Sequence, residues 1–285
     1  MSKHNSEQTN LLRRSIFWLM ILLAVVGITY SYEKSLFQDG IDIITSSATT
    51  KELPIYSVQT DKPQVALSFN ADRGNEDTQK ILDTLKKYNV HVTFFMTGEW
   101  VKEYPDDVKA IHNAGHDLGN HSENHKQMSQ LGNSEINDEI NKVTEKVKSL
   151  AGYTMCLFRP PYGDYNNHVI TQAKSCGYYP IEWSVDSLDW KNYGADSIVD
   201  TVLNHKDLKN GAIILMHNGA KYTAEALPKV IEGLQKKGFE IVPISQLIYK
   251  DNYHIEHDGS QVSDQNSTEA QSETSDSTIQ MSETK

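Results

Sequence analysis

His121 and His125 stand four residues apart in the segment His-Ser-Glu-Asn-His, just after a short strand-like run. Imidazoles at this spacing share one face of a helical turn and can bind the same metal ion. Such a pair alone is more often a surface or capping feature, so the interpretation depends on what else the chain carries. A carboxylate beside the pair would complete a site with open positions for water and substrate, as a hydrolytic metal requires.

Other residues capable of chemistry recur directly after strand-like runs of the chain. These residues are Asp72, Arg159, Asp186 and His217. A barrel of parallel strands presents its active site at the carboxyl ends of its strands. The repeated placement therefore predicts that these side chains and the histidine pair belong to one site.

The elements that must position these residues alternate regularly along the chain. Strand-like runs lie at 65–69, 92–96, 116–119, 156–158, 179–183, 212–216 and 240–242. Helical patterns lie between them at 78–88, 105–113, 133–150, 166–175, 195–203 and 224–237. Strands that alternate with helices in this way indicate βα units and a parallel sheet.

These motifs together resemble the polysaccharide deacetylases, the NodB-homology domain of carbohydrate esterase family 4. The resemblance covers residues 65–249 and implies an α/β fold, a distorted (β/α)7 barrel. It implies that His121 and His125 ligate one divalent metal, with zinc favoured and cobalt or nickel as alternatives. It also implies an N-deacetylase of an N-acetylated cell-envelope glycan. Peptidoglycan is the favoured polymer, and chitin- or xylan-type substrates remain open.

The segment Arg159-Pro160-Pro161-Tyr162-Gly163 is similar to the third motif of this family. The resemblance implies that Arg159 holds the catalytic carboxylate. It also implies that the backbone N–H of Tyr162 helps to bind the oxyanion as the acetyl carbonyl becomes tetrahedral. Without the resemblance, the same segment would be a proline-fixed turn with a structural arginine.

His217 is similar to the family's catalytic acid, which protonates the leaving amine. Asp186 resembles the carboxylate that orients this histidine and raises its pKa. Tyr162, Trp190 and Leu215 are candidates for lining a sugar-binding groove, although aromatic residues at such positions are equally common in protein cores.

The first motif departs from the family pattern, Thr-Phe-Asp-Asp-Gly. This chain has Asn70 in place of the general base, Ala71 in place of a metal ligand, and Asp72 two residues beyond Asn70. Strand alternation returns Asp72 to the face of Asn70. Three interpretations follow. Asp72 ligates the metal of a weak enzyme, which we favour; or Asp72 is the base, with Asn70 contributing its amide oxygen to the metal; or the domain is a catalytically silent glycan-binding module.

The first 62 residues are predicted to lie outside the catalytic domain. Residues 15–31 are apolar and follow Arg13 and Arg14, which predicts a cytoplasmic segment at 1–14 and a single membrane anchor. A cleaved signal peptide, and hence secretion, is the alternative. We expect a stalk at 32–62 and an extracytoplasmic domain at 63–250.

Residues 251–285 are rich in Ser, Thr, Gln and acids, and we expect a disordered tail. The formal net charge is −11, with no basic stripe, so the composition excludes a typical nucleic-acid-binding protein. Cys156 and Cys176 are the two cysteines, and a disulfide between them is permitted outside the cytoplasm. No feature of the sequence predicts an oligomeric state.

Overall fold

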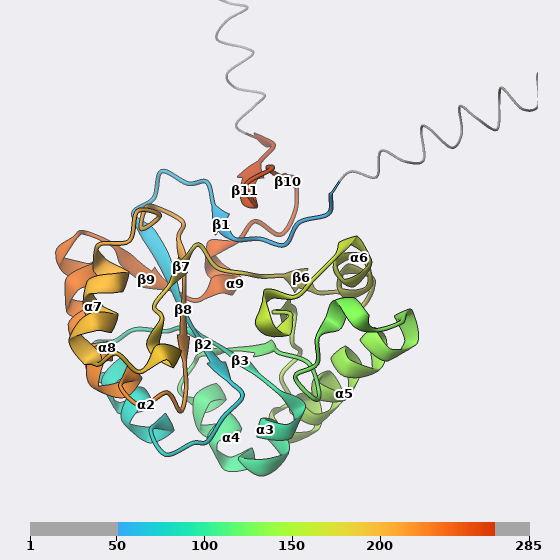
Figure 1. The fold of residues 1–285 in the computed structure, drawn as a ribbon, viewed down its shortest axis with the longest axis horizontal. Coiled ribbons are helices and arrows are strands. Elements are labelled where there is room, and N and C mark those ends of the chain that lie inside the picture. Colours follow the sequence, from blue (N-terminus) through green and yellow to red (C-terminus); the bar gives the residue numbers. More distant parts are fainter. Residues whose placement is uncertain (1–50, 266–285) are drawn as a thin grey trace, which may run out of the picture. The chain divides into compact units, whose positions relative to one another are not determined.

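The computed structural model describes residues 51–265, in which strands and helices alternate (Figure 1). The main-sheet strands are β2 (Gln64–Ala71), β3 (Thr93–Met96), β4 (Asp117–Asn120), β5 (Leu157–Phe158), β6 (Tyr179–Pro180), β7 (Val185–Asp186), β8 (Ile213–His217) and β9 (Glu240–Val242). The helices are α2 (Thr78–Lys87), α3 (Gly98–Glu103), α4 (Pro105–Asn113), α5 (Asn133–Ala151), α6 (Asn167–Ser175), α7 (Ala195–Leu203), α8 (Thr223–Lys236) and α9 (Ile244–Leu247). Every predicted strand and helix is present, while β7, α3 and α9 were not predicted.

All pairings within this sheet are parallel, in the order β6-β5-β4-β3-β2-β8-β7, and β9 also pairs with β2. The sheet curls into a half-barrel, with helices on its outside (Figure 1). The predicted α/β fold is confirmed in this form, which is consistent with a distorted (β/α)7 barrel. Strands β6 and β7 form its two edges.

Strand β2 is buried on both faces, as expected of a central parallel strand. Its alternate side chains enter two different cores. Phe69 stacks on Phe94 of β3, with ring centroids 5.1 Å apart, in the core shared with the helices. Ala66 packs with Phe95 and Ile213 in the core on the concave face of the sheet. The polar side chains that follow are therefore held by a rigid, fully packed strand.

The described residues before the predicted domain boundary at 63, from 52 onward, pack on the barrel instead of forming a stalk. Ile55 bridges to Ile181 beside β6, and Val58 of β1 (Ser57–Val58) donates its N–H to the carbonyl of Gly211. Gly211 has φ +77°, and a Cβ there would collide with the Val58 carbonyl. The predicted start of the domain at 63 is too late, because backbone pairings such as these leave no hydrophobic periodicity in the sequence.

The predicted disordered tail is also wrong for its first part. Strands β10 (Tyr253–Ile255) and β11 (Ser260–Ser263) form an antiparallel hairpin, and β11 pairs with β1. The amide of Gln261 is buried and bonds both the N–H and the carbonyl of Tyr249. Backbone pairing and this satisfied amide stabilise a segment whose composition lacks large apolar side chains.

Other predictions fall partly outside the described residues. The segments 1–14 and 15–31, most of the stalk, and residues 266–285 of the tail lie beyond the range 51–265. Within that range, no helix has the length and apolar character needed to cross a membrane. Cys156 and Cys176 are free thiols, so the permitted disulfide is not formed.

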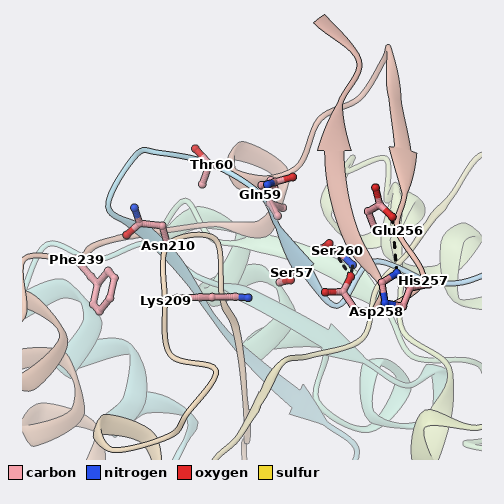
Figure 2. Close-up of a pocket in the computed structure, with 11 residues that line it drawn as sticks. Ser57, Gln59, Thr60, Lys209, Asn210, Phe239, Glu256, His257, Asp258 and Ser260 are labelled. Carbon is pink, nitrogen blue, oxygen red and sulfur yellow. Dashed lines mark hydrogen bonds and ion pairs between the residues drawn. The ribbon is translucent and has the colours of Figure 1, made fainter. Parts of the chain in front are cut away.

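A hollow of about 720 Å³ opens beside the β10–β11 hairpin (Figure 2). Lys209 and Asn210 precede β8, and Phe239 precedes β9, so the hollow lies at the amino ends of the strands. The residues predicted to act in the site follow the carboxyl ends, and none of them lines this hollow. The candidate site therefore lies at the other end of the sheet, where the strands have their carboxyl ends.

Candidate active site

The predicted site residues converge at the carboxyl ends of adjacent strands. Asn70, next to last in β2, is in register with His217, the last residue of β8. Asn120 ends β4 in register with Met96 of β3, and the histidine segment begins at the next residue. Because parallel strands end at a common edge, the tertiary structure brings together side chains from opposite halves of the sequence.

The loop that carries the histidines is held in an uncommon backbone conformation. Ser122 and His125 both have positive φ values, 65° and 52°, which are costly for residues other than glycine. Helix α5 opposes that cost through Glu139, which is only 3% exposed. Its carboxylate accepts hydrogen bonds from the backbone N–H and the side-chain amide of Asn124, at 2.8 and 2.7 Å.

Glu123, between the two histidines, is also tied to α5. Its carboxylate pairs with Lys146, which donates a further hydrogen bond to the carbonyl of Gly98. Nothing in the local sequence identified Glu139 or Lys146 as partners of the loop. A helix thus fixes the loop at Asn124 and Glu123, directly beside His125.

His121 presents one ring nitrogen as a free acceptor. Its Nδ1 lies 2.7 Å from the carbonyl oxygen of Arg159, which can only accept, so Nδ1 carries the proton. Nε2 is buried and has no hydrogen-bond partner. Burial lowers the pKa of His121, and the nearby His125 lowers it further. The ring is thus a neutral imidazole with an unused lone pair, the form in which histidine binds metals.

Asp72 lies next to the second histidine. His125 Nε2 is 3.4 Å from Asp72 Oδ2, and the rings of His125 and His121 are 4.9 Å apart. Asp72 Oδ1 is buried without a hydrogen-bond partner, although Arg73 Nε lies 3.8 Å from it. His121 Nε2 and Asp72 Oδ1 are thus two buried atoms without a hydrogen-bond partner, and each has a lone pair that a cation would satisfy.

As the side chains lie, however, no three His, Cys, Asp or Glu groups within 51–265 form a cluster able to hold a metal. His125 faces the Asp72 carboxylate directly, so two of the three predicted ligands engage each other. Burial lowers the pKa of His125, with Asp72 opposing that effect. Two imidazoles and one carboxylate nevertheless have the chemistry that suits a divalent metal.

Arg159 is completely buried and reaches the position of the missing base. Nη1 donates to Oδ1 of Asn70 and Nη2 to Oγ of Ser68, both at 2.9 Å. Its guanidinium carbon is 4.1 Å from the ring centroid of Phe95. The arginine contacts residue 70 as the resemblance implied, but it holds a neutral amide where a carboxylate was expected. Ala71 packs in the helix-facing core, away from the metal donors.

The partner of His217 is Asp189, and the prediction of Asp186 is wrong. His217 Nδ1 and Asp189 Oδ1 are 2.7 Å apart, and Asp189 Oδ2 accepts from the backbone N–H of His217 and from Thr223. Burial opposes ionisation of Asp189, but the bonds from His217 and Thr223 hold its pKa below the usual value.

Asp186 has a local role instead. It lies on β7, and its Oδ1 accepts the N–H of Leu188, which closes the turn into the short helix η3 (Asp189–Lys191). Asp189 directly precedes Trp190, and this position next to an aromatic residue of the site was the one sequence feature that could have identified it. The choice between two aspartates three residues apart depends on the path of this turn, which includes Leu188 at φ 55°.

The residues predicted to line a sugar groove have different environments. Tyr162 is 67% exposed, has φ 63°, and lies edge-on to His125 with ring centroids 4.5 Å apart. Trp190 is 42% exposed, beside the His217 partner. Leu215 is buried within β8, in register with Ser68. Tyr162 and Trp190 are thus available to a ligand, while contact with Leu215 stays a prediction.

Comparison with known proteins places this geometry in a family. Residues 57–181 match the family model for polysaccharide deacetylase. A peptidoglycan-N-acetylglucosamine deacetylase of Bacillus cereus is 36% identical over 196 residues, 67% of this chain and 70% of that protein. The peptidoglycan-N-acetylmuramic acid deacetylase PdaA of Bacillus subtilis is 34% identical over 68% of this chain and 75% of that protein.

Similar solved structures include a protein described as a pseudoenzyme. BA3943 of Bacillus anthracis, a pseudoenzyme of carbohydrate esterase family 4, superimposes with a TM-score of 0.65 at 35% identity, over 68% of each chain. A mutant of BA3943 with restored enzymatic activity matches with the same TM-score and identity, over 68% of this chain and 70% of that one. With its motifs, its half-barrel and these relatives, the chain belongs to the polysaccharide deacetylase family, carbohydrate esterase family 4.

Proposed function

We propose that this protein binds one divalent metal and removes acetyl groups from an N-acetylated cell-wall glycan, with peptidoglycan as the substrate. The observation that carries the proposal is that two buried atoms, His121 Nε2 and Asp72 Oδ1, lack a hydrogen-bond partner at the same end of the sheet as the His217–Asp189 pair. The names of the relatives, which are peptidoglycan deacetylases, support the choice of polymer. Zinc suits two imidazoles and a carboxylate, and cobalt or nickel are the alternatives.

In this proposal Asp72, His121 and His125 hold the metal, which supplies Lewis acidity toward the acetyl carbonyl. His217 carries the proton for the leaving amine. Because Nδ1 is engaged by Asp189, Nε2 is the nitrogen that delivers it as the amide C–N bond breaks. The oxygen of water forms the new bond to the acetyl carbon, and the backbone N–H of Tyr162 stabilises the developing oxyanion.

The proton that water must lose has no dedicated acceptor among residues 51–265, so in this proposal it passes to solvent. Asn70 occupies the position of the base, and an amide has no useful proton affinity at neutral pH. Its oxygen is already engaged by Arg159. Asp72 is committed to the metal in this proposal. We therefore expect a slow enzyme, since general base catalysis typically contributes about 10²–10⁴-fold.

A second candidate, a glycan-binding protein without activity, is favoured by one observation. Arg159 holds the neutral amide of Asn70 where the family has a carboxylate, and the similar BA3943 is described as a pseudoenzyme. Against it stands the complete His217–Asp189–Thr223 network, which a protein that only binds glycan does not need.

The proposal includes a location. The apolar run 15–31 after Arg13 and Arg14 favours a membrane anchor with the domain on the outer side, where peptidoglycan lies. A cleaved signal peptide would place the same domain outside the cell as a secreted protein.

Acetate release by the full chain tests the function. Protein stripped of metal and reloaded with zinc or cobalt is incubated with N-acetylated peptidoglycan and with chitooligosaccharides, beside the Asn70→Asp and His121→Ala variants. Slow, metal-dependent release that His121→Ala abolishes and Asn70→Asp accelerates by about 10²-fold or more supports a weak enzyme. Release by Asn70→Asp alone supports the silent glycan-binding protein. No release by any form contradicts the deacetylase assignment.

A further inference from the structure

Two exposed aromatic side chains beside the site contact the ammonium group of a lysine. Among residues 51–265, the exposed large hydrophobic side chains are Tyr162, Trp190 and Tyr193. Lys191 Nζ lies 5.1 Å from the ring centroid of Trp190 and 6.0 Å from that of Tyr193. The ammonium group is thus held by two aromatic rings at the surface, an arrangement that is attractive in itself.

This group has a defined position relative to the catalytic acid. Trp190 and Lys191 follow Asp189 in the short helix η3, and Asp189 is anchored by three hydrogen bonds from His217 and Thr223. Leu188 and Asn192, which bound the helix, both have left-handed backbone conformations. The backbone that carries Lys191 is therefore anchored beside the partner of His217.

Three neighbouring strands each place a cation beyond their carboxyl ends. Strands β2, β8 and β7 are adjacent, and Arg73, Lys221 and Lys191 follow them respectively. Within the described part of the chain, the contacts of Lys191 and Lys221 are with aromatic rings, and Lys221 lies over the ring of Tyr222. Arg73 lies 3.8 Å from Asp72 and shares its loop with the exposed Glu76. Of the three, Lys191 and Lys221 are thus the cations without a carboxylate partner in the described structure.

These cations contrast with the charge of the whole chain, which is −11. A strongly acidic protein repels an anionic polymer at long range. Local cations at the rim of the site would reverse that effect at the point of binding. Exposed aromatic faces beside them suit the C–H face of a sugar ring, so the combination recognises a sugar that also bears an acidic group.

We infer that Lys191, between Trp190 and Tyr193, binds a carboxylate on the glycan, so that the preferred substrate is an acidic N-acetylated polysaccharide over a neutral one. This inference rests on the proposed function and narrows its substrate class. The carboxylate has two possible chemical sources, an acidic ether substituent on the sugar or a peptide attached to it. Both present the same group to the lysine.

Calorimetric titration of the full chain with defined oligosaccharides tests the inference without any need for turnover. The probes are a neutral N-acetylglucosamine tetrasaccharide, a tetrasaccharide with lactyl-ether carboxylates on alternate sugars, and the same tetrasaccharide with its carboxylates extended by a short acidic peptide. The variants are Lys191→Gln and Lys221→Gln. Lys142→Gln, at an exposed lysine of α5 that pairs with Asp138, is the matched control.

We expect the wild type to bind one of the acidic tetrasaccharides about fivefold more tightly than the neutral one. Lys191→Gln should remove most of that preference, with a larger loss of affinity for the acidic probes than for the neutral one, while Lys142→Gln changes neither. Raised salt should weaken the preference. The acidic probe that gains most identifies the source of the carboxylate.

Two other outcomes overturn the inference in different ways. Equal binding of neutral and acidic glycans, or an equal loss for both in Lys191→Gln, refutes the carboxylate contact and leaves the proposed function intact. No binding of any glycan by the wild type contradicts the proposed function, and the inference fails with it.

Discussion

Arg159 donates a hydrogen bond of 2.9 Å to the side-chain oxygen of Asn70, in a fully buried position on the concave face of the sheet. A guanidinium has no acceptor, so the amide must present its oxygen to the arginine, and its remaining polar group is an NH₂ donor. Residue 70 can therefore donate to a water molecule but cannot take its proton.

An acidic residue, Glu182, lies near Arg159 in the barrel. Glu182 is buried beside it, and its backbone carbonyl accepts from Arg159 Nη2 at 3.2 Å. Burial raises the pKa of the Glu182 carboxyl, with Arg159 opposing that effect. The arginine thus keeps a neighbouring acid even though Asn70 carries no charge.

Asp189 should matter far more than Asp186. Asp189→Asn removes the carboxylate that accepts from His217 and Thr223, and we expect activity to fall by about 10²-fold or more. Asp186→Asn changes a turn contact and should cost less than about tenfold. Both are measured as acetate release in the Asn70→Asp background, with urea unfolding as the check on folding. The reverse ranking would restore Asp186 as the partner of the acid.

Metal affinity should depend on the histidines and on the carboxylate of the predicted ligand set. His121→Ala and Asp72→Ala are each expected to weaken zinc binding by more than about 100-fold, beyond the loss typical of residues that only support a ligand. Competition with a chromophoric chelator measures this directly. His112→Ala, which removes a histidine that contacts Tyr153, is the control and should not change the affinity. Unchanged binding in Asp72→Ala would exclude this residue as the carboxylate ligand.

Glu139 should act on the site through the histidine loop. Glu139→Gln keeps the shape of the side chain but weakens its hydrogen bonds to Asn124 and its ion pair with Lys126, at 3.1 Å. We expect about tenfold weaker zinc binding. Glu145→Gln, at an exposed position of the same helix, is the matched control. If both variants bind zinc as the wild type does, the loop holds its conformation without α5.

The stability of the domain should fall in weakly acidic solution because of His116. Burial lowers the pKa of His116 to about 4, with nearby His91 contributing, whereas an unfolded histidine titrates near about 6.5. Between these values the unfolded chain binds a proton that the folded chain does not. The free energy of unfolding is thus complete above about pH 6.5 and decreases as the pH falls toward 4, by up to about 3 kcal/mol.

Urea unfolding across pH 4–7 measures this effect. His116→Phe has no titratable ring and should show a smaller decrease over the same pH range, whatever its stability at neutral pH. His112→Gln should retain the decrease seen in the wild type. An identical pH dependence in His116→Phe would assign the loss of stability to other groups.

The sequence by itself determined the order of the elements and the family. Strands β2 and β8 are runs of buried apolar residues, and their length and composition report burial on both faces. The residues that end them, Asn70 and His217, were identifiable for the same reason. Strand alternation also predicted Asp72 on the face of Asn70, because that geometry is local and has a period of two, whereas its contact with His125 comes from the tertiary structure.

Only the tertiary structure decided which side chains meet across loops. The choice of Asp189 over Asp186 depends on a turn with left-handed residues, and the bond from Glu139 to Asn124 joins a helix to a loop. The pairing of β11 with β1 joins the two ends of the domain. None of these contacts has a periodic signal, because each depends on backbone angles and long-range packing that no short segment of the chain encodes.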